Sequence, residues 1–140
     1  MNNLADSCTP GQDQEEGQDW TGEMVTRADL CVRVAAEAGY RLDFEPNSVS
    51  VLEQMVEDLW GTQGPERPDV VAAVIGSYLG EVVRRHIGGD WAWNAEYQTP
   101  GLVRGEKWVF PLARAQKRLV DGRGDNLAVF YVAIGELQLL

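Results

Sequence analysis

Apolar residues recur every three or four positions in five stretches of the chain, and this spacing predicts five helices. The helices are expected to begin near Thr26, Pro46, Pro68, Pro111 and Asp125. The predicted buried stripe of the first helix is Leu30, Cys31, Val34, Ala35 and Ala38. For the fourth it is Leu112, Ala115, Leu119 and Val120, and for the last it is Leu127, Phe130, Tyr131, Ile134 and Leu137. Residues 42–44 are expected to form a short extended piece before the second helix.

The third helix, from about Pro68 to Ile87, carries apolar residues on more than one side, which predicts a central position. Ala72, Gly76 and Gly80 fall four residues apart on one of its faces. A glycine inside a helix costs about 1 kcal/mol relative to alanine. Two glycines at this spacing therefore indicate that another backbone packs closely against the helix.

Alternating aromatic residues after Gly88-Gly89 predict a small antiparallel sheet of about three strands. Residues 90–97 are the first expected strand, with Trp91 and Trp93 on one face. Residues 99–101 are expected to form a turn. Residues 102–110 then resemble a hairpin around Gly105-Glu106, with Trp108 and Phe110 on a common face. We expect the aromatic side chains of the sheet to stack on the third helix.

The two ends of the chain differ in composition. Residues 1–22 contain several acidic residues and no Lys or Arg, which predicts a disordered acidic tail. This tail is either a solvated segment or an interaction arm. Residues 23–140 fit one domain, since 140 residues are enough to bury a core without a staple. The expected fold class is α+β, with about five helices packed on the sheet.

The net charge of −10 and pI near 4.4 exclude nucleic acid as a whole-surface partner, because phosphate binding needs a basic footprint. The charge permits a basic partner protein. Cys8 and Cys31 form no Cys-x-x-Cys pair, so we expect neither a disulfide framework nor a zinc site. There is no apolar run of about 18 residues and no signal-peptide pattern. These features predict a cytoplasmic protein with no membrane partner.

The first candidate site is the segment around Glu81, Arg85, His86 and Trp91. Glu81 and Arg85 lie four residues apart and can pair on one helix face. His86 lies roughly 140° round the helix from Glu81, so the two do not share a face. With one histidine and no thiolate nearby, we expect no metal site. His86 in a last helical turn can instead offset exposed carbonyl groups.

The second candidate site is a basic strip on the outer side of the fourth helix: Arg114, Lys117 and Arg118, with Arg104, Lys107 and Arg123 nearby. The strip is either a surface for an anionic ligand or acidic partner, or a solvated helix face. Trp91, Trp93 and Trp108 are either a stacking platform or part of the core.

Signals for covalent chemistry are missing. No serine lies in a Gly-x-Ser-x-Gly context, and no glycine-rich phosphate loop is present. Cys31 falls in an apolar stripe, which indicates a core thiol. We therefore expect no cofactor and favour a non-catalytic protein.

Four segments carry a resemblance: Tyr-Leu-Gly-Glu-Val-Val-Arg-Arg-His at 78–86, Gly-Gly-Asp-Trp at 88–91, Phe-Pro-Leu-Ala-Arg-Ala-Gln-Lys-Arg-Leu at 110–119 and Asp-Asn-Leu-Ala-Val-Phe-Tyr at 125–131. With them the chain resembles a group of small uncharacterised bacterial proteins over roughly residues 40–135. The resemblance implies a bacterial α+β domain of the cytosol, and it implies no activity or catalytic residue.

Three functional hypotheses follow. The leading one is a protein-binding module, immunity-like or regulatory. The second is a small enzyme or ligand-binding domain centred on Glu81, Arg85, His86 and Trp91. The third is a self-assembling structural subunit that uses the apolar C-terminal residues 137–140.

Overall fold

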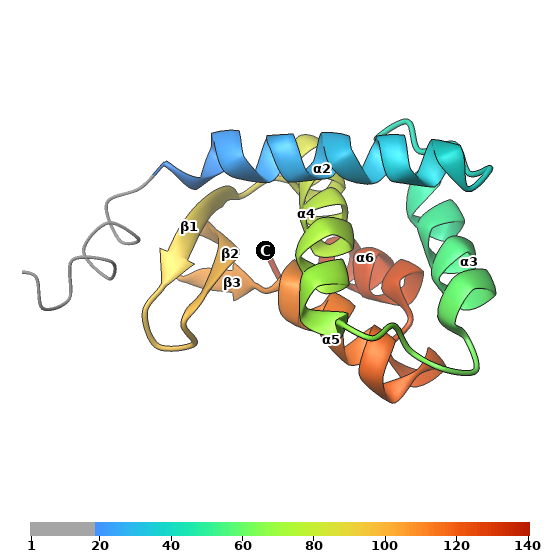
Figure 1. Ribbon diagram of the computed structural model, residues 1–140. Coiled ribbons are helices and arrows are strands. Elements are labelled where there is room, and N and C mark those ends of the chain that lie inside the picture. The colour runs from blue at the N-terminus through green and yellow to red at the C-terminus, as the bar shows by residue number, and fades with distance from the viewer. Residues whose placement is uncertain (1–18) are drawn as a thin grey trace, which may run out of the picture.

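The computed structural model describes residues 19–140, and within them it contains five α-helices and one three-stranded sheet (Figure 1). The helices are α2 (Trp20–Glu37), α3 (Ser48–Trp60), α4 (Pro68–His86), α5 (Pro111–Asp121) and α6 (Leu127–Glu136). The strands are β1 (Asp90–Asn94), β2 (Thr99–Arg104) and β3 (Lys107–Val109), and a 3-10 turn (Arg123–Asp125) precedes α6. The predicted α+β fold class is confirmed.

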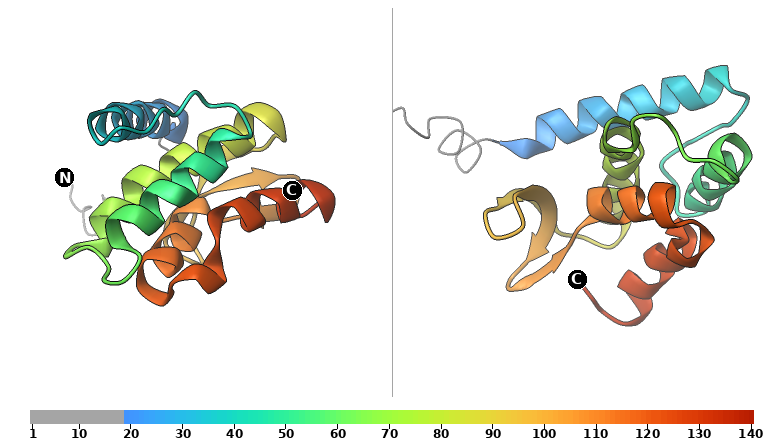
Figure 2. Two further views of the ribbon diagram at one scale, coloured as in Figure 1. Left: turned by 90° about the vertical axis from the view of Figure 1, so that its right-hand side faces the viewer. Right: turned by 60° about the horizontal axis from the view of Figure 1, so that its bottom comes forward.

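Helix α4 is the centre of the molecule. It packs most extensively against α5 and α2, and every residue from Ile75 to Val83 is buried. Figure 1 shows α2 lying across one side of α4, with the sheet at one end of the molecule and α3 at the other. Figure 2 shows α6 at the outer edge of this arrangement. A central third helix was predicted from its apolar residues, and the prediction is confirmed.

Helix α2 begins at Trp20, six positions before the predicted start at Thr26. Asp19 caps it by accepting a hydrogen bond from the Thr21 amide at 3.0 Å. Its buried stripe is Trp20, Met24, Ala28, Cys31 and Ala35, whereas Leu30 and Val34 are exposed. The rings of Trp20 and Trp93 stack at 5.7 Å, and this tertiary contact favours the longer helix. Residues 1–18 of the predicted tail, with Cys8, lie outside the described residues.

The sheet is antiparallel with the order β1-β2-β3. Strand β1 ends at Asn94 rather than Tyr97, and the predicted turn at residues 99–101 is the start of β2. Pro100 is tolerated in this middle strand because it pairs with Trp93 at a point that β3 does not reach. The predicted turn at Gly105 is confirmed, and Trp108 stacks on Phe110 with 5.8 Å between ring centroids.

Three further predictions about local structure differ from the structure. The extended piece predicted at residues 42–44 does not continue through Phe44, which has a left-handed φ of 64°. Helix α3 starts at Ser48 rather than Pro46. Helix α6 is capped by Asn126, whose side chain accepts from two backbone amides, because Asp125 is bound to basic residues of α5 instead.

The glycine spacing in α4 marks close packing, as predicted. A Cβ atom at Gly76 would lie 2.6 Å from the Cα of Leu112 in α5. A Cβ atom at Gly80 would overlap the ring of Trp91 and meet Pro111. The two glycines therefore let α5 and the sheet reach the backbone of α4.

We expect Gly80→Ala to lower the free energy of unfolding by about 1–3 kcal/mol, because a methyl group there must displace the Trp91 ring. Urea unfolding followed by circular dichroism measures the change. Gly22→Ala is the matched control, since Gly22 lies inside α2 with no atom near the added methyl group. The control should be neutral or more stable by up to about 1 kcal/mol. Equal losses in both variants would contradict close packing at Gly80.

Candidate functional site

The carboxylate of Glu81 is the most completely enclosed charged group in the described chain, and its side chain has no exposed surface. It accepts two hydrogen bonds from Arg84, at 2.7 and 2.8 Å, and one from Arg85 Nε at 3.1 Å. Trp91 Nε1 donates a fourth at 2.8 Å. We call Glu81, Arg84, Arg85 and Trp91 the Glu81 cluster.

Helical spacing and one tight turn bring this cluster together. Arg84 and Arg85 lie three and four residues after Glu81, so all three share one face of α4. Gly88 and Gly89, with φ values of 134° and 96°, turn the chain so that β1 runs back along the helix. Trp91 then reaches over Gly80 to the Glu81 carboxylate.

Burial by itself raises the pKa of Glu81, but the hydrogen bonds from Arg84 and Trp91 outweigh it and the net pKa is lowered. The group is therefore an ionised carboxylate at neutral pH. Its lone pairs are already used by four donors. Glu81 and the buried Trp91 thus act as a structural joint and leave no surface for a ligand.

Arg85 and His86 hold the loop before α3. The Arg85 guanidinium lies 3.9 Å from the centroid of the Phe44 ring, a cation–π contact. His86 Nε2 lies 2.8 Å from the carbonyl oxygen of Phe44, and the Phe44 amide donates to the Tyr78 hydroxyl at 2.8 Å. His86 therefore bonds this loop rather than a carbonyl at the end of its own helix. These contacts fix Phe44 in its left-handed conformation.

Arg118 does not lie on the outer side of α5, so that prediction is wrong. Its side chain is 2% exposed, and it donates to Glu53 at 2.8 Å and Glu57 at 2.9 Å. The second oxygen of Glu53 accepts from the Leu127 amide at the start of α6. The second oxygen of Glu57 binds Arg123 at 2.5 Å. This Arg118 cluster joins α3, α5 and α6.

The rest of the predicted basic strip is partly neutralised. Arg114 and Lys117 lie 3.2 and 3.9 Å from the Asp125 carboxylate. The Arg114 guanidinium also lies 4.8 Å from the centroid of Phe130. Lys117 keeps 59% of its side chain exposed and Arg114 keeps 33%. These two residues, unlike Arg118, remain accessible to a partner.

The three tryptophans predicted as a possible platform lie in different surroundings. Trp91 is in the core, Trp93 stacks on Trp20, and Trp108 stacks on Phe110. They therefore form no single stacking surface.

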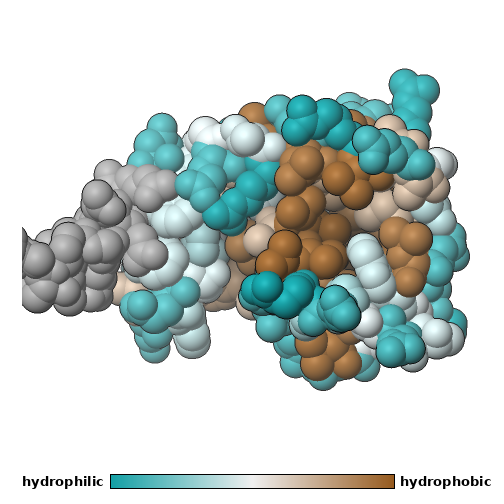
Figure 3. Space-filling view, in the orientation of Figure 1, coloured by the Kyte–Doolittle hydropathy of each residue, from teal (hydrophilic) through white to brown (hydrophobic). Residues whose placement is uncertain are grey.

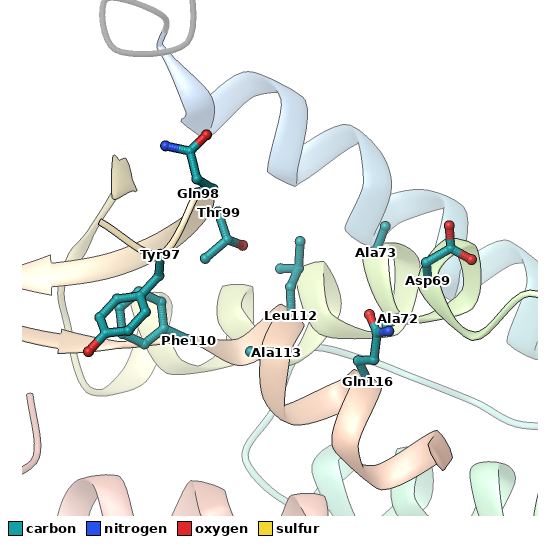
Figure 4. Close-up of a pocket in the computed structure, with 10 residues that line it drawn as sticks. All are labelled: Asp69, Ala72, Ala73, Tyr97, Gln98, Thr99, Phe110, Leu112, Ala113 and Gln116. Carbon is teal, nitrogen blue, oxygen red and sulfur yellow. The ribbon is translucent and has the colours of Figure 1, made fainter. Parts of the chain in front are cut away.

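An open cleft of about 610 Å³ lies between the first half of α4, the turn after β1 and the start of α5 (Figure 4). In Figure 4, Tyr97 and Gln98 stand on one side, Asp69 on the other, and Leu112 between them. The Asp69 carboxylate is held by Arg67 at 3.2 Å. None of the predicted site residues lines this cleft. Sequence reasoning missed it because its walls come from three separate segments.

Helix α6 exposes an apolar surface that sequence reasoning also missed. Val129, Val132 and Leu137 are 66%, 55% and 69% exposed, although Leu137 was predicted to point inward. We call the surface of Val129, Val132, Ala133 and Leu137 the α6 face. Its signal in the sequence is the composition of Leu127–Glu136, which includes a single charged residue. The segment after α6 turns back, and Leu140 is buried.

Apolar residues are also exposed on two other helices, α2 and α4. Val34 of α2 and Val70 of α4 are each 50% exposed. Figure 3 shows apolar surface gathered over the centre of the molecule in the orientation of Figure 1. In the α6 face, Val129 and Val132 lie on adjacent helical turns, and Leu137 is the residue that caps the C-terminal end of the helix.

Among residues 19–140, no three His, Cys, Asp or Glu side chains gather closely enough to hold a metal ion. No helix in this part of the chain combines the length and apolarity needed to cross a membrane. Comparison of the chain with protein-family models, with curated proteins and with solved structures finds no match.

We expect Glu81→Ala to lower the free energy of unfolding by about 3 kcal/mol, because it leaves Trp91 Nε1 without an acceptor and two arginines without their counter-ion. Chemical unfolding at pH 7 measures this loss. The control is Glu81→Gln, which keeps a hydrogen-bond acceptor for Trp91 and should lose less free energy of unfolding than Glu81→Ala. A loss below about 0.5 kcal/mol for Glu81→Ala would contradict the structural role of the cluster.

The same variants carry a pH test. Because folding lowers the pKa of Glu81 below its ordinary value of 4.5, the unfolded chain takes up the proton first as the pH falls. The stability from the Glu81 carboxylate is therefore present above about pH 4.5 and is lost as the pH drops toward the lowered value. The difference in free energy of unfolding between the wild type and Glu81→Gln should become smaller as the pH is lowered from 6 to about 3. A constant gap would show that this carboxylate does not titrate differently in the two states.

Proposed function

We propose that this protein is a non-catalytic protein-binding module that contacts its partner through the α6 face. The observation that carries the proposal is the exposure of Val129 and Val132 on a helix that is apolar on nearly all sides, together with that of Leu137 just after its end. A helix of that composition is ordinarily buried on all sides. Contiguous exposed apolar surface is a mark of protein contact sites.

The arrangement of charge supports a binding module over an enzyme. The two buried charged groups at the centres of the clusters, Glu81 and Arg118, are each hydrogen-bonded to groups within the chain. A catalytic acid or base would need a free polar atom facing substrate. The open cleft beside Asp69 offers a ligand more accessible space than the Glu81 cluster, whose carboxylate is fully enclosed.

The finer assignments rest on the sequence alone. A regulatory or immunity-like role and a place in a bacterial cytoplasm remain proposals that follow from the resemblance and the acidic composition. The structure of the α6 face is compatible with either role, since both use protein contacts.

A photo-crosslinking amino acid placed at Val129 should give one discrete covalent adduct on illumination of the native host, because that residue lies in the α6 face. Gel mobility and mass spectrometry measure the adduct. The same amino acid at Val120 of α5, which is 61% exposed, is the matched control and should give no discrete adduct.

A second variant adds Val132→Asp to the Val129 crosslinker, and we expect the adduct to fall at least tenfold. Circular dichroism confirms that the fold is kept, since Val132 is 55% exposed. No adduct from Val129, or equal adducts from Val129 and Val120, would refute binding through the α6 face.

A further inference from the structure

A pocket of about 350 Å³ opens between the end of β3, the first turns of α5, the side of α6 and the segment after it. Three aromatic residues, one aliphatic residue and two cations line it: Trp108, Phe110, Phe130, Leu139, Arg114 and Lys117. We call it the Trp108 pocket. Its volume lies at the lower end of the range for small-molecule sites, so it suits a ligand with a single ring.

The aromatic walls of the pocket are held in place by contacts within the fold. The rings of Trp108 and Phe110 stack almost parallel, with 5.8 Å between their centroids. The Phe130 ring of α6 lies under the Arg114 guanidinium at 4.8 Å. All three aromatic residues are half-buried, so part of each remains accessible. Such walls favour a ligand with a flat apolar body.

The charged residues that line the Trp108 pocket are cations. Arg114 and Lys117 both come from α5, and no carboxylate is among the lining side chains. By contrast, Asp69 lines the cleft described above, and Glu136 lines two other hollows beside α6. The Trp108 pocket is therefore suited to an anionic ligand, although the chain as a whole is acidic.

Asp125 uses only part of the binding capacity of these two cations. Its carboxylate lies 3.2 Å from one terminal nitrogen of Arg114 and 3.9 Å from Lys117 Nζ, and within residues 19–140 it is the only carboxylate that pairs with either. A guanidinium has five N–H donors and an ammonium three. One carboxylate shared by two cations leaves one positive charge uncompensated. That single charge favours a monoanion such as a carboxylate over a phosphate dianion, which Asp125 would repel more strongly.

We propose that the Trp108 pocket binds an aromatic monocarboxylate. The carboxylate would lie between Arg114 and Lys117, and the ring would lie against the aromatic walls. Phe130 and Asp125 already hold the Arg114 side chain, so binding costs less conformational entropy there. The planar guanidinium can also donate to both oxygens of a carboxylate. This site shares no residue with the α6 face, so it goes beyond the proposed protein contact and does not depend on it.

Titration of the full chain with 3-phenylpropionate at pH 7, followed by proton–nitrogen NMR, tests the site. The acid should shift the indole N–H signal of Trp108 and the amide signals of Arg114 and Lys117. It should saturate with a Kd on the order of 1 mM, the strength expected of a ligand this small. 3-Phenylpropionamide has the same ring without the charge and should bind about fivefold more weakly or less. No saturable shift, or equal binding of acid and amide, would overturn the proposal.

Two charge variants locate the carboxylate. Lys117→Gln should weaken binding of the acid about fivefold and leave the binding of the amide unchanged, because only the acid carries a charge. Arg67→Gln is the matched control, since Arg67 is also a largely exposed cation, at 69% against 59%, and pairs with Asp69 beside the other cleft. It should bind the acid like the wild type. Equal weakening by the two variants would contradict the proposed site.

A steric variant locates the ring. Ala113→Leu enlarges an exposed side chain in the pocket wall, so it should keep the fold and weaken acid and amide alike. Circular dichroism checks the fold. Unchanged binding by Ala113→Leu, or shifts confined to Tyr97 and Gln98 in the other cleft, would place the ligand elsewhere and refute binding in the Trp108 pocket.

Discussion

The buried carboxylate of Glu81 is the group on which the arrangement of this molecule depends. An ionised carboxylate removed from water costs several kcal/mol unless it is paired and hydrogen-bonded. Here the four bonds come from α4 and from β1 together. The requirement that Trp91 reach Glu81 fixes where β1 begins after the two glycines. Because Trp91 pairs with Leu102 in the sheet, it also fixes the position of β2.

The Arg118 cluster likewise fixes the positions of secondary-structure elements relative to one another. Arg118 binds Glu53 and Glu57 of α3, and Glu53 also satisfies an amide at the start of α6. The Glu81 cluster joins α4 to β1, whereas the Arg118 cluster joins α5 to α3 and α6, so the two clusters hold different elements of the fold. Glu81 and Arg118, the buried charged residues among residues 19–140, are both bonded to other parts of the fold.

Most of the fold could be predicted from local sequence patterns. The apolar residues of α4, the glycines at 76 and 80, and the Glu81–Arg85 pair all act within a few residues, so spacing alone predicts them. What spacing could not reveal are the contacts between distant segments. Arg118 meets Glu53 across 65 positions, and it looked like part of a solvated face. Trp20 extends α2 into a polar segment because it stacks on Trp93. The cleft beside Asp69 also has walls from separate segments.

The α6 face is the part of the molecule that folding does not explain. Leu127 and Ile134 bury the inner side of α6, and Asn126 caps it, so the helix has what it needs to form and pack. Polar residues at Val129 and Val132 would leave those contacts unchanged. Surface valines also lower helix propensity slightly relative to Glu or Lys. The proposed contact through the α6 face would give these exposed apolar residues, which contribute nothing to the core, a role.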